Sequence, residues 1–302
     1  MKKLLLIGCC CWLAQATAQQ QGLQNLYFFD LAYVNAAYAG HHDALSASTI
    51  LRKQWVGFNG APETFALALH SPLRNQNMAL GLNAHYERIG PRDVTSLAAT
   101  YAYRIRLREK SRLSFALRAG AENHRFDFDK IEYRDENDPI QWQGSQSNWM
   151  PVFDFAVLAT GEKFFGGLQV SNLAQARIRD VELSESRQFL HATAVGGYLF
   201  VLSDKVALKP NALVRYAENA PVQLDLNLHA LFMERFWLGA GYRHQYGMLA
   251  MVQFRATDKL EVGYAYDFAL NPMRNQHAGS HELYLSYRFN VFKSRFSSPR
   301  YF

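Results

Sequence analysis

Cysteine is nearly absent from this chain of 302 residues. All three cysteines fall within the first eighteen residues, at Cys9, Cys10 and Cys11. If that stretch is removed during export, the mature chain has no thiol. This would exclude disulfides, zinc-thiolate sites and a cysteine nucleophile.

The first eighteen residues have the layout of an export signal. A charged start at Lys2 and Lys3 precedes an apolar stretch from Leu4 to Ala14, and Ala16-Thr17-Ala18 forms a small-residue cleavage site. We therefore predict a signal peptide over residues 1–18 that is cut after Ala18. Reading Leu6 to Cys9 as a lipidation site would leave only about five apolar residues before the cysteine, fewer than such signals need.

The rest of the chain lacks a membrane-length apolar run, a low-complexity tract and a Pro-, Ser- or Gly-rich linker. Without Lys2 and Lys3, 30 Lys and Arg stand against 26 Asp and Glu, a net charge of +4 on 284 residues. That charge is too mild and too dispersed for a nucleic-acid surface. The sequence thus predicts one exported domain and no nucleic-acid partner.

The main pattern in the chain is an alternation of apolar and polar residues. Residues 222–230 alternate without a fault, which places the aliphatic side chains on one face of a strand. The 14% of aromatic residues also favours β structure. Fourteen such segments are predicted: 44–56, 63–71, 77–88, 94–107, 112–124, 149–159, 163–172, 189–202, 205–216, 221–232, 236–244, 247–256, 259–269 and 280–291.

The lengths of the connections separate a soluble sandwich from a membrane barrel. The tight joins, such as 108–111, 160–163 and 257–259, all follow even-numbered segments, whereas the long ones, 125–148, 173–188 and 270–279, follow odd-numbered segments. Outer-membrane barrels have short periplasmic turns and longer external loops. We predict an all-β, transmembrane antiparallel β-barrel of about 14 strands, with 12 to 16 possible and both termini periplasmic.

In such a barrel the apolar face meets lipid and the polar face lines the lumen. Inward arginines are expected to meet inward carboxylates there: Arg104, Arg106, Arg118, Arg215, Arg243 and Arg255 with Glu87, Asp154, Asp225, Glu261 and Asp267. Pro151 and Pro210 fall within predicted strands, and each removes one ladder hydrogen bond. A bulge or a strand end is therefore expected at both prolines.

Catalytic and metal signatures are weak. His70, His85 and His229 point inward by phase, but no nucleophile elbow or adjacent base singles out a serine. The acidic loop from Asp127 to Asp138 could gather calcium, although it lacks EF-hand spacing. Adjacent strand side chains point opposite ways, which disfavours a metal at His41-His42. We predict no enzyme activity, no cofactor and no metal site.

Two strings near the start of the mature chain carry a family resemblance. Asn35-Ala36-Ala37-Tyr38-Ala39-Gly40 resembles the Asn-Pro-Ala-Tyr-Ala-Gly motif of the PorP/SprF family, outer-membrane proteins of type IX secretion and gliding motility in Bacteroidota. Ala36 replaces the usual proline. The second string is similar to the Gln-Trp-Val-Gly-Phe-x-Gly-Ala-Pro signature of that family; it comprises Gln54, Trp55, Val56, Gly57, Phe58, Asn59, Gly60, Ala61 and Pro62.

The resemblance implies a noncatalytic outer-membrane barrel. Its expected partners are membrane lipid, the periplasmic and trans-envelope parts of the type IX apparatus, and a secreted cargo or surface adhesin. Architecture alone would also fit a general solute channel. The expected division is 1–18 signal peptide, 19–41 periplasmic or plug segment, 42–291 barrel and 292–302 periplasmic tail.

The tail mixes cationic and aromatic residues, a composition suited to an interface. Disorder, or a role of Phe302 in barrel assembly, is the competing interpretation of the tail. The candidate docking residues are Arg295, Phe296, Ser298, Pro299, Arg300, Tyr301 and Phe302.

Overall fold

A computed structural model describes residues 22, 24–108, 110–131, 144–178 and 186–289. The chain forms a closed 14-stranded antiparallel barrel, in which β10 and β11 make up one barrel strand interrupted at Leu199. Its first seven strands are β1 (Leu45–Lys53), β2 (Glu63–Pro72), β3 (Met78–Ile89), β4 (Arg92–Arg108), β5 (Ser111–Asp127), β6 (Ser145–Thr160) and β7 (Phe164–Ser171). The others are β10 (His191–Tyr198), β11 (Phe200–Ser203), β12 (Val206–Ala217), β13 (Gln223–Phe232), β14 (Phe236–Arg243), β15 (Gly247–Arg255), β16 (Leu260–Ala269) and β17 (Ser280–Phe289).

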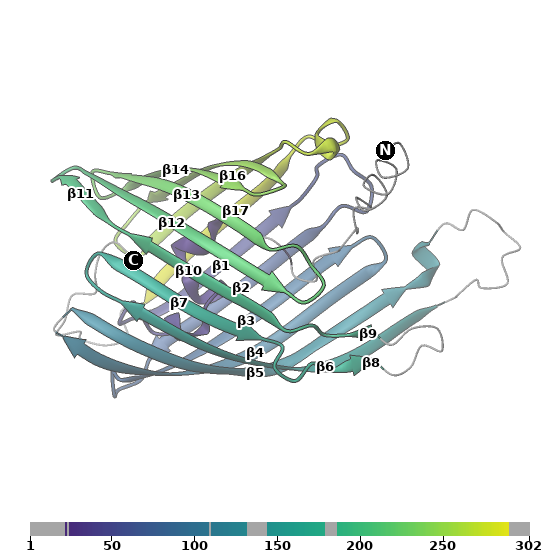
Figure 1. The fold of residues 1–302 in the computed structure, drawn as a ribbon, viewed down its shortest axis with the longest axis horizontal. Helices are drawn as coiled ribbons and strands as arrows, with labels where there is room; N and C mark the ends of the chain where they lie inside the picture. Colours follow the sequence, from purple (N-terminus) through teal and green to yellow (C-terminus); the bar gives the residue numbers. More distant parts are fainter. Residues whose placement is uncertain (1–21, 23, 109, 132–143, 179–185, 290–302) are drawn as a thin grey trace, which may run out of the picture.

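Each barrel strand pairs with its sequence neighbours, and the ends meet where β1 runs antiparallel to β17, with Leu45 opposite Phe289 (Figure 1). Closure leaves no sheet edge in the membrane, where unpaired backbone groups could not be solvated. The predicted fold and strand count are confirmed. Strand boundaries differ from the predicted ones by a few residues, most at β6, which begins at Ser145 rather than 149.

The two ends of the barrel differ in their connections. Tight turns join β4 to β5, β6 to β7 and β15 to β16 at one end, which we name the short-turn end. The opposite, long-loop end carries the connections after β1, β5, β7 and β16. It also holds a small hairpin of β8 (Arg177–Ile178) and β9 (Ser186–Arg187), and the 3-10 helices η4 (Phe128–Lys130) and η5 (Pro272–Asn275). Outer-membrane barrels have their short turns on the periplasmic side, so we expect the short-turn end to face the periplasm.

The outward face of the barrel is apolar. Leu51, Phe65, Leu97, Leu168 and Leu283 are among the exposed large hydrophobic residues, whereas buried polar residues such as Arg52, Thr64, Gln169 and Glu282 alternate with them and point inward. Lipid covers such a face in an outer-membrane barrel. Among the described residues, no helix is long and apolar enough to span a membrane.

The expectation of an interruption at Pro151 is wrong. Pro151 faces Ala121 within an unbroken β5–β6 register. The carbonyl of Phe153, two residues along, accepts from Leu173 on the side away from β5 (2.9 Å), so the backbone of Pro151 also points away from β5. No β5–β6 hydrogen bond is therefore lost.

Pro210 also keeps its strand continuous, facing Leu228 in an unbroken β12–β13 register. On its other side it falls between the β10 and β11 pairings of β12, beside the interruption at Leu199. The expected irregularity is thus present on the neighbouring strand and not at the proline itself.

Residues 24–43, which we call the lumen segment, run inside the barrel through three 3-10 helices: η1 (Leu26–Phe29), η2 (Leu31–Tyr33) and η3 (Ala36–Tyr38) (Figure 1). Nearly all of its residues are buried. An even strand count alone would put the start of the chain at the short-turn end. Instead, Asn25 contacts Glu282 at the long-loop end, and the segment crosses the lumen to reach Leu45 at the other end.

Candidate functional site

The first anchor of the lumen segment is a buried charge cluster at the long-loop end. Glu282 accepts hydrogen bonds from the backbone N–H groups of Asn25 (2.9 Å) and Leu26 (2.7 Å). Arg52 joins Glu282 (3.0 Å) to Asp267, and Asp267 also accepts from the side chain of Asn25. One guanidinium and two carboxylates, from strands β1, β16 and β17, therefore hold the lumen segment at the long-loop end.

A second ion pair lies beside the first. Arg243 binds both oxygens of Asp225 (2.9 and 2.8 Å) and donates to the carbonyl of Gln24 (3.1 Å). Tyr27 accepts from Asn227 (3.1 Å). Bidentate geometry of this kind is the strong form of an arginine–carboxylate pair.

Aromatic packing fills the centre of the lumen. Phe28 lies on the ring of His229, with ring centroids 3.8 Å apart, and Phe29 packs against Tyr284. Asp30 then accepts from Ser48 (2.5 Å) and Ala32 (3.0 Å), with His70 at 3.5 Å. Burial alone would raise the pKa of Asp30, but the nearby His70 ring and the hydrogen bonds from Ser48 and Ala32 hold it below its usual value.

The first family string, residues 35–40, forms the part of the lumen segment nearer the short-turn end. The side-chain amide of Asn35 donates to the carbonyls of Val157 (3.1 Å) and Leu168 (3.2 Å), and its oxygen caps η3 at Ala37 (3.0 Å). Gly40 has φ +73°, and a Cβ there would lie 2.5 Å from the Cβ of Ala79. The asparagine and the glycine are thus required by the local fit to the barrel wall.

Two histidines follow this string at the short-turn end. They lie in a turn and not on a strand, so the expectation that their side chains diverge is wrong: both rings lie against Tyr38, at 4.8 and 5.6 Å. Burial, together with Arg112 and Arg104, lowers the pKa of His41 to about 3. Burial also lowers the pKa of His42 well below its usual value. Both are therefore neutral inside the barrel.

The second family string, residues 54–62, lies at the opposite end of the lumen. Val56 exchanges backbone hydrogen bonds with Ala278 (2.8 Å) and Gly279 (2.9 Å), and Gly60 accepts from Gly90 (2.9 Å). The connection after β1 is thereby fastened to those after β16 and β3. Phe58 is exposed on the resulting rim. The two strings are thus not brought together; they occupy opposite ends of the barrel.

Several predicted lumen pairs are present. Arg118 pairs with Asp154 (3.7 Å), Arg243 with Asp225 and Arg255 with Glu261 (3.0 Å). Others differ from expectation: Asp267 pairs with Arg52, Arg104 lies 3.7 Å from Asp43, and Arg106 is exposed. The predicted set of lumen charges omits Arg52, Asp43 and Glu282, although the inward phase of Arg52 and Glu282 in their strands is a usable signal.

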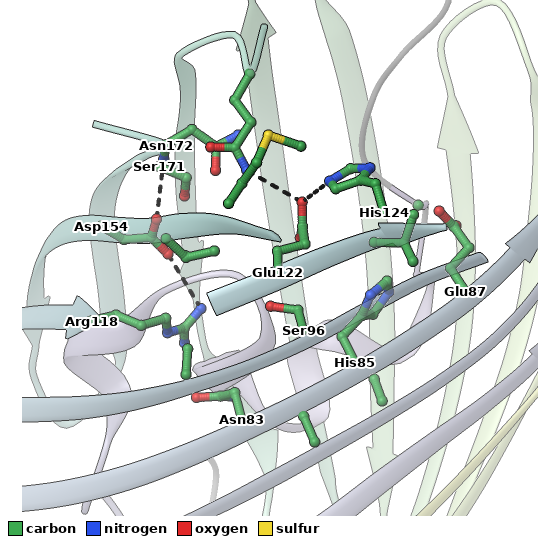
Figure 2. Close-up of a pocket in the computed structure, with 18 of the residues that line it drawn as sticks. Asn83, His85, Glu87, Ser96, Arg118, Glu122, His124, Asp154, Ser171 and Asn172 are labelled. Atoms are coloured by element: carbon green, nitrogen blue, oxygen red, sulfur yellow. Dashed lines mark hydrogen bonds and ion pairs between the residues drawn. The ribbon is translucent and has the colours of Figure 1, made fainter. Parts of the chain in front are cut away.

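A cavity of about 590 Å³ opens between the lumen segment and the long β3–β7 wall near the long-loop end. Figure 2 shows Glu122 between His124 and a second donor, and Asp154 between Arg118 and Asn172. That second donor is Gln188 (3.4 Å). Its lining mixes polar and apolar side chains: amides, hydroxyls, three arginines and three carboxylates lie among apolar residues that include Val94, Phe126, Met150 and Val152.

The inward histidines have structural contacts. His70 accepts from the N–H of Gly40 (3.1 Å), His85 lines the cavity, and His229 contacts Asn211 (2.9 Å) and Phe28. None of these contacts is to a serine hydroxyl. Within the described residues, no group of three or more His, Cys, Asp or Glu is placed to hold a metal. The signal peptide, most of the acidic loop and the tail residues Arg295 to Phe302 lie outside the described residues.

A family comparison covers nearly the whole chain. Residues 16–287 match the family described as "Type IX secretion system membrane protein PorP/SprF". The chain belongs to the PorP/SprF family. Membership in PorP/SprF, together with the barrel, indicates an outer-membrane location. No curated protein is significantly similar to this PorP/SprF chain.

Solved outer-membrane structures resemble this PorP/SprF barrel. A FadL homologue of Pseudomonas aeruginosa has 10% sequence identity and a TM-score of 0.49, over 85% of this chain and 93% of its own. The monoaromatic hydrocarbon channel CymD has 12% identity and a TM-score of 0.47, over 89% and 94%. Omp33 of Acinetobacter baumannii has 12% identity and a TM-score of 0.45, over 83% and 100%.

Proposed function

We propose that this PorP/SprF protein is a noncatalytic docking component of type IX secretion and not a solute channel. The observation that carries this proposal is the lumen segment that crosses the inside of the barrel. Residues 24–43 occupy it from end to end and are held by ion pairs at Arg52 and Arg243 and by aromatic packing at His229. In this proposal the segment is a plug, and the surfaces that remain for partners are the two ends of the barrel.

The plug predicts that the purified protein does not conduct solutes. Liposomes containing the wild-type protein should not swell in an iso-osmotic sugar solution, because the buried ion pairs and aromatic contacts keep the segment in place. A porin of similar strand number reconstituted at equal density serves as the positive control. Rapid, unselective swelling would favour the general solute channel and contradict the docking role.

The short-turn end is the proposed dock for periplasmic machinery. Its sequence-based candidate is the tail from Phe292 to Phe302, which carries Lys293, Arg295 and Arg300 among aromatic residues. Secreted cargo or a surface adhesin would then meet the long-loop rim that includes residues 54–62. A pull-down from the native outer membrane would identify both sets of partners.

Deleting Phe292–Phe302 is expected to remove the periplasmic partners from that pull-down. The barrel should still migrate as a heat-modifiable band, because the pairing of β17 with β1 ends at Phe289. As a control, Lys259→Ala removes one cation from a tight turn at the same end and should leave the pull-down unchanged. If the truncated protein still co-purifies with the same periplasmic partners, the tail is not the dock.

A further inference from the structure

The cavity at the long-loop end contains one arginine that has no hydrogen-bond partner among the described residues. Three arginines line it, and two have partners: Arg92 contacts His124 (3.1 Å), and Arg118 contacts Asp154 and the carbonyl of Ala32 (2.8 Å). The third, Arg215, has no hydrogen bond or ion pair within the described part of the chain. Its Nε and one terminal nitrogen are buried without a partner.

Asp225, on the neighbouring strand β13, does not neutralise the charge of Arg215. Asp225 attracts Arg215 at longer range, but its two oxygens already accept three hydrogen bonds, two from Arg243 and one from Gln223 (3.0 Å). A buried charge left without a partner is costly. Because the guanidinium faces a cavity, an anion from outside the protein can supply that partner.

A second unmatched group in the cavity is an acceptor. Gln188 is only 4% exposed, and its amide nitrogen donates to Glu122 (3.4 Å). Its amide oxygen is buried and has no donor. The cavity thus presents a cation that requires an anion and an oxygen that requires an N–H or O–H group.

The charges of the cavity limit which anion can bind. Glu87, Glu122 and Asp154 also line it, and they would repel a doubly charged phosphate. A carboxylate carries a single charge and fits one guanidinium in a bidentate manner. Phe126, Met150 and Val152 lie among the polar residues of the β5–β6 wall and offer apolar contact to a hydrophobic group on the same ligand.

We propose that this cavity binds the carboxyl-terminal end of a peptide, with its carboxylate on Arg215, a backbone N–H on the oxygen of Gln188 and an apolar side chain against the wall. A fatty acid shares the carboxylate and the apolar group but has no N–H for Gln188. The volume of about 590 Å³ lies within the usual range of small-ligand sites. The proposal rests on the cavity and not on the secretion role.

Calorimetric titration of the full-length protein in lipid nanodiscs tests the assignment, with empty nanodiscs as the blank. The probes are the N-acetylated tripeptide Ala-Ala-Phe with a free carboxylate, the same peptide as its C-terminal amide, and octanoate. The free acid should bind at least about tenfold more tightly than the amide, since a charge-assisted hydrogen bond contributes roughly that factor or more. Octanoate should bind more weakly than the free acid.

Two substitutions assign the binding to the named groups. Arg215→Gln should weaken binding of the free acid about tenfold or more and leave the amide unchanged, whereas Gln188→Leu should weaken both peptides. Arg235→Gln removes the same charge from an exposed turn at the short-turn end and is the matched control. Heat-modifiable migration verifies that each variant is folded.

Three results would overturn the proposal. Equal affinity for acid and amide, or full binding of the acid by the Arg215→Gln variant, would remove the carboxylate subsite. Tighter binding of octanoate than of the peptide acid would identify a fatty acid as the ligand. No binding of any probe at low millimolar concentration would mean that the cavity holds only water. Each result is separable from the outcome of the swelling and pull-down experiments.

Discussion

Replacing Arg52 with alanine should lower the free energy of unfolding by about 3–5 kcal/mol, because it leaves buried carboxylates without their cation. Arg52 is 1% exposed in its side chain, and its partners Asp267 and Glu282 are 0% exposed. The two carboxylates would then face each other in the lumen with only the donors of Asn25 and Leu26 and the Tyr246 hydroxyl close to Asp267. Urea titration in detergent, followed by the shift of the heat-modifiable band, measures the loss.

The adjacent residue provides the control. Lys53 pairs with Glu63 at 3.2 Å, but the two side chains are 62% and 50% exposed. Such surface pairs contribute about 0–1 kcal/mol, so Lys53→Ala should have a barely measurable effect. Comparable losses of unfolding free energy in the two variants would show that the Arg52 cluster does not hold the lumen segment at the long-loop end.

Loosening this anchor should also open the barrel. The backbone N–H groups of Asn25 and Leu26 bind Glu282, and protonation of Glu282 to relieve the unpaired charge would weaken those hydrogen bonds. Liposomes carrying the Arg52→Ala protein should therefore swell in sugar solution where the wild type does not. If the variant is clearly destabilised but its liposomes do not swell, other contacts keep the lumen closed, namely those of Arg243 or the aromatic centre.

The barrel itself could be predicted because its physics is periodic. Strict alternation over residues 222–230 fixes which face is buried, and a shift by one residue would turn every apolar side chain toward the lumen. The alternation of short and long connections then distinguishes a membrane barrel from a soluble sandwich. Both features are local in the sequence, so they can be read without knowing which strands meet.

The contents of the lumen could not be predicted in the same way. The contact of Asn25 with Glu282 joins residues separated by 257 positions, and no periodic pattern reports such a pair. The path of the lumen segment from the long-loop end to Leu45 is set by these contacts. Pro151 is a smaller example of the same limit. Whether a proline interrupts a strand depends on which neighbouring strand its backbone faces, and the local sequence does not show this.

Acid should release the lumen segment. Within the barrel the pKa of His41 is lowered from 6.5 to about 3, so the neutral form is favoured in the closed state. In a released segment the histidine regains its ordinary value and binds a proton more readily. Closure is therefore fully stable above about pH 6.5, and it weakens by about 1.4 kcal/mol for each pH unit below that value until the lowered pKa is reached.

Conductance in planar bilayers measures this release. Between about pH 7 and pH 4.5 the frequency of open events should rise by roughly 100-fold or more, since two pH units of protonation at one histidine amount to about 2.7 kcal/mol. His42 acts in the same direction, because its pKa is also lowered by burial. The dependence on pH should therefore correspond to the uptake of about two protons.

Substitution separates the two histidines. His41→Phe preserves the ring that stacks on Tyr38 at 4.8 Å but cannot bind a proton, so it should reduce the slope to about one proton. His244→Phe changes an exposed histidine in a tight turn and should leave the slope unchanged. Retention of the full slope when both His41 and His42 are replaced by Phe would assign the acid response to other groups.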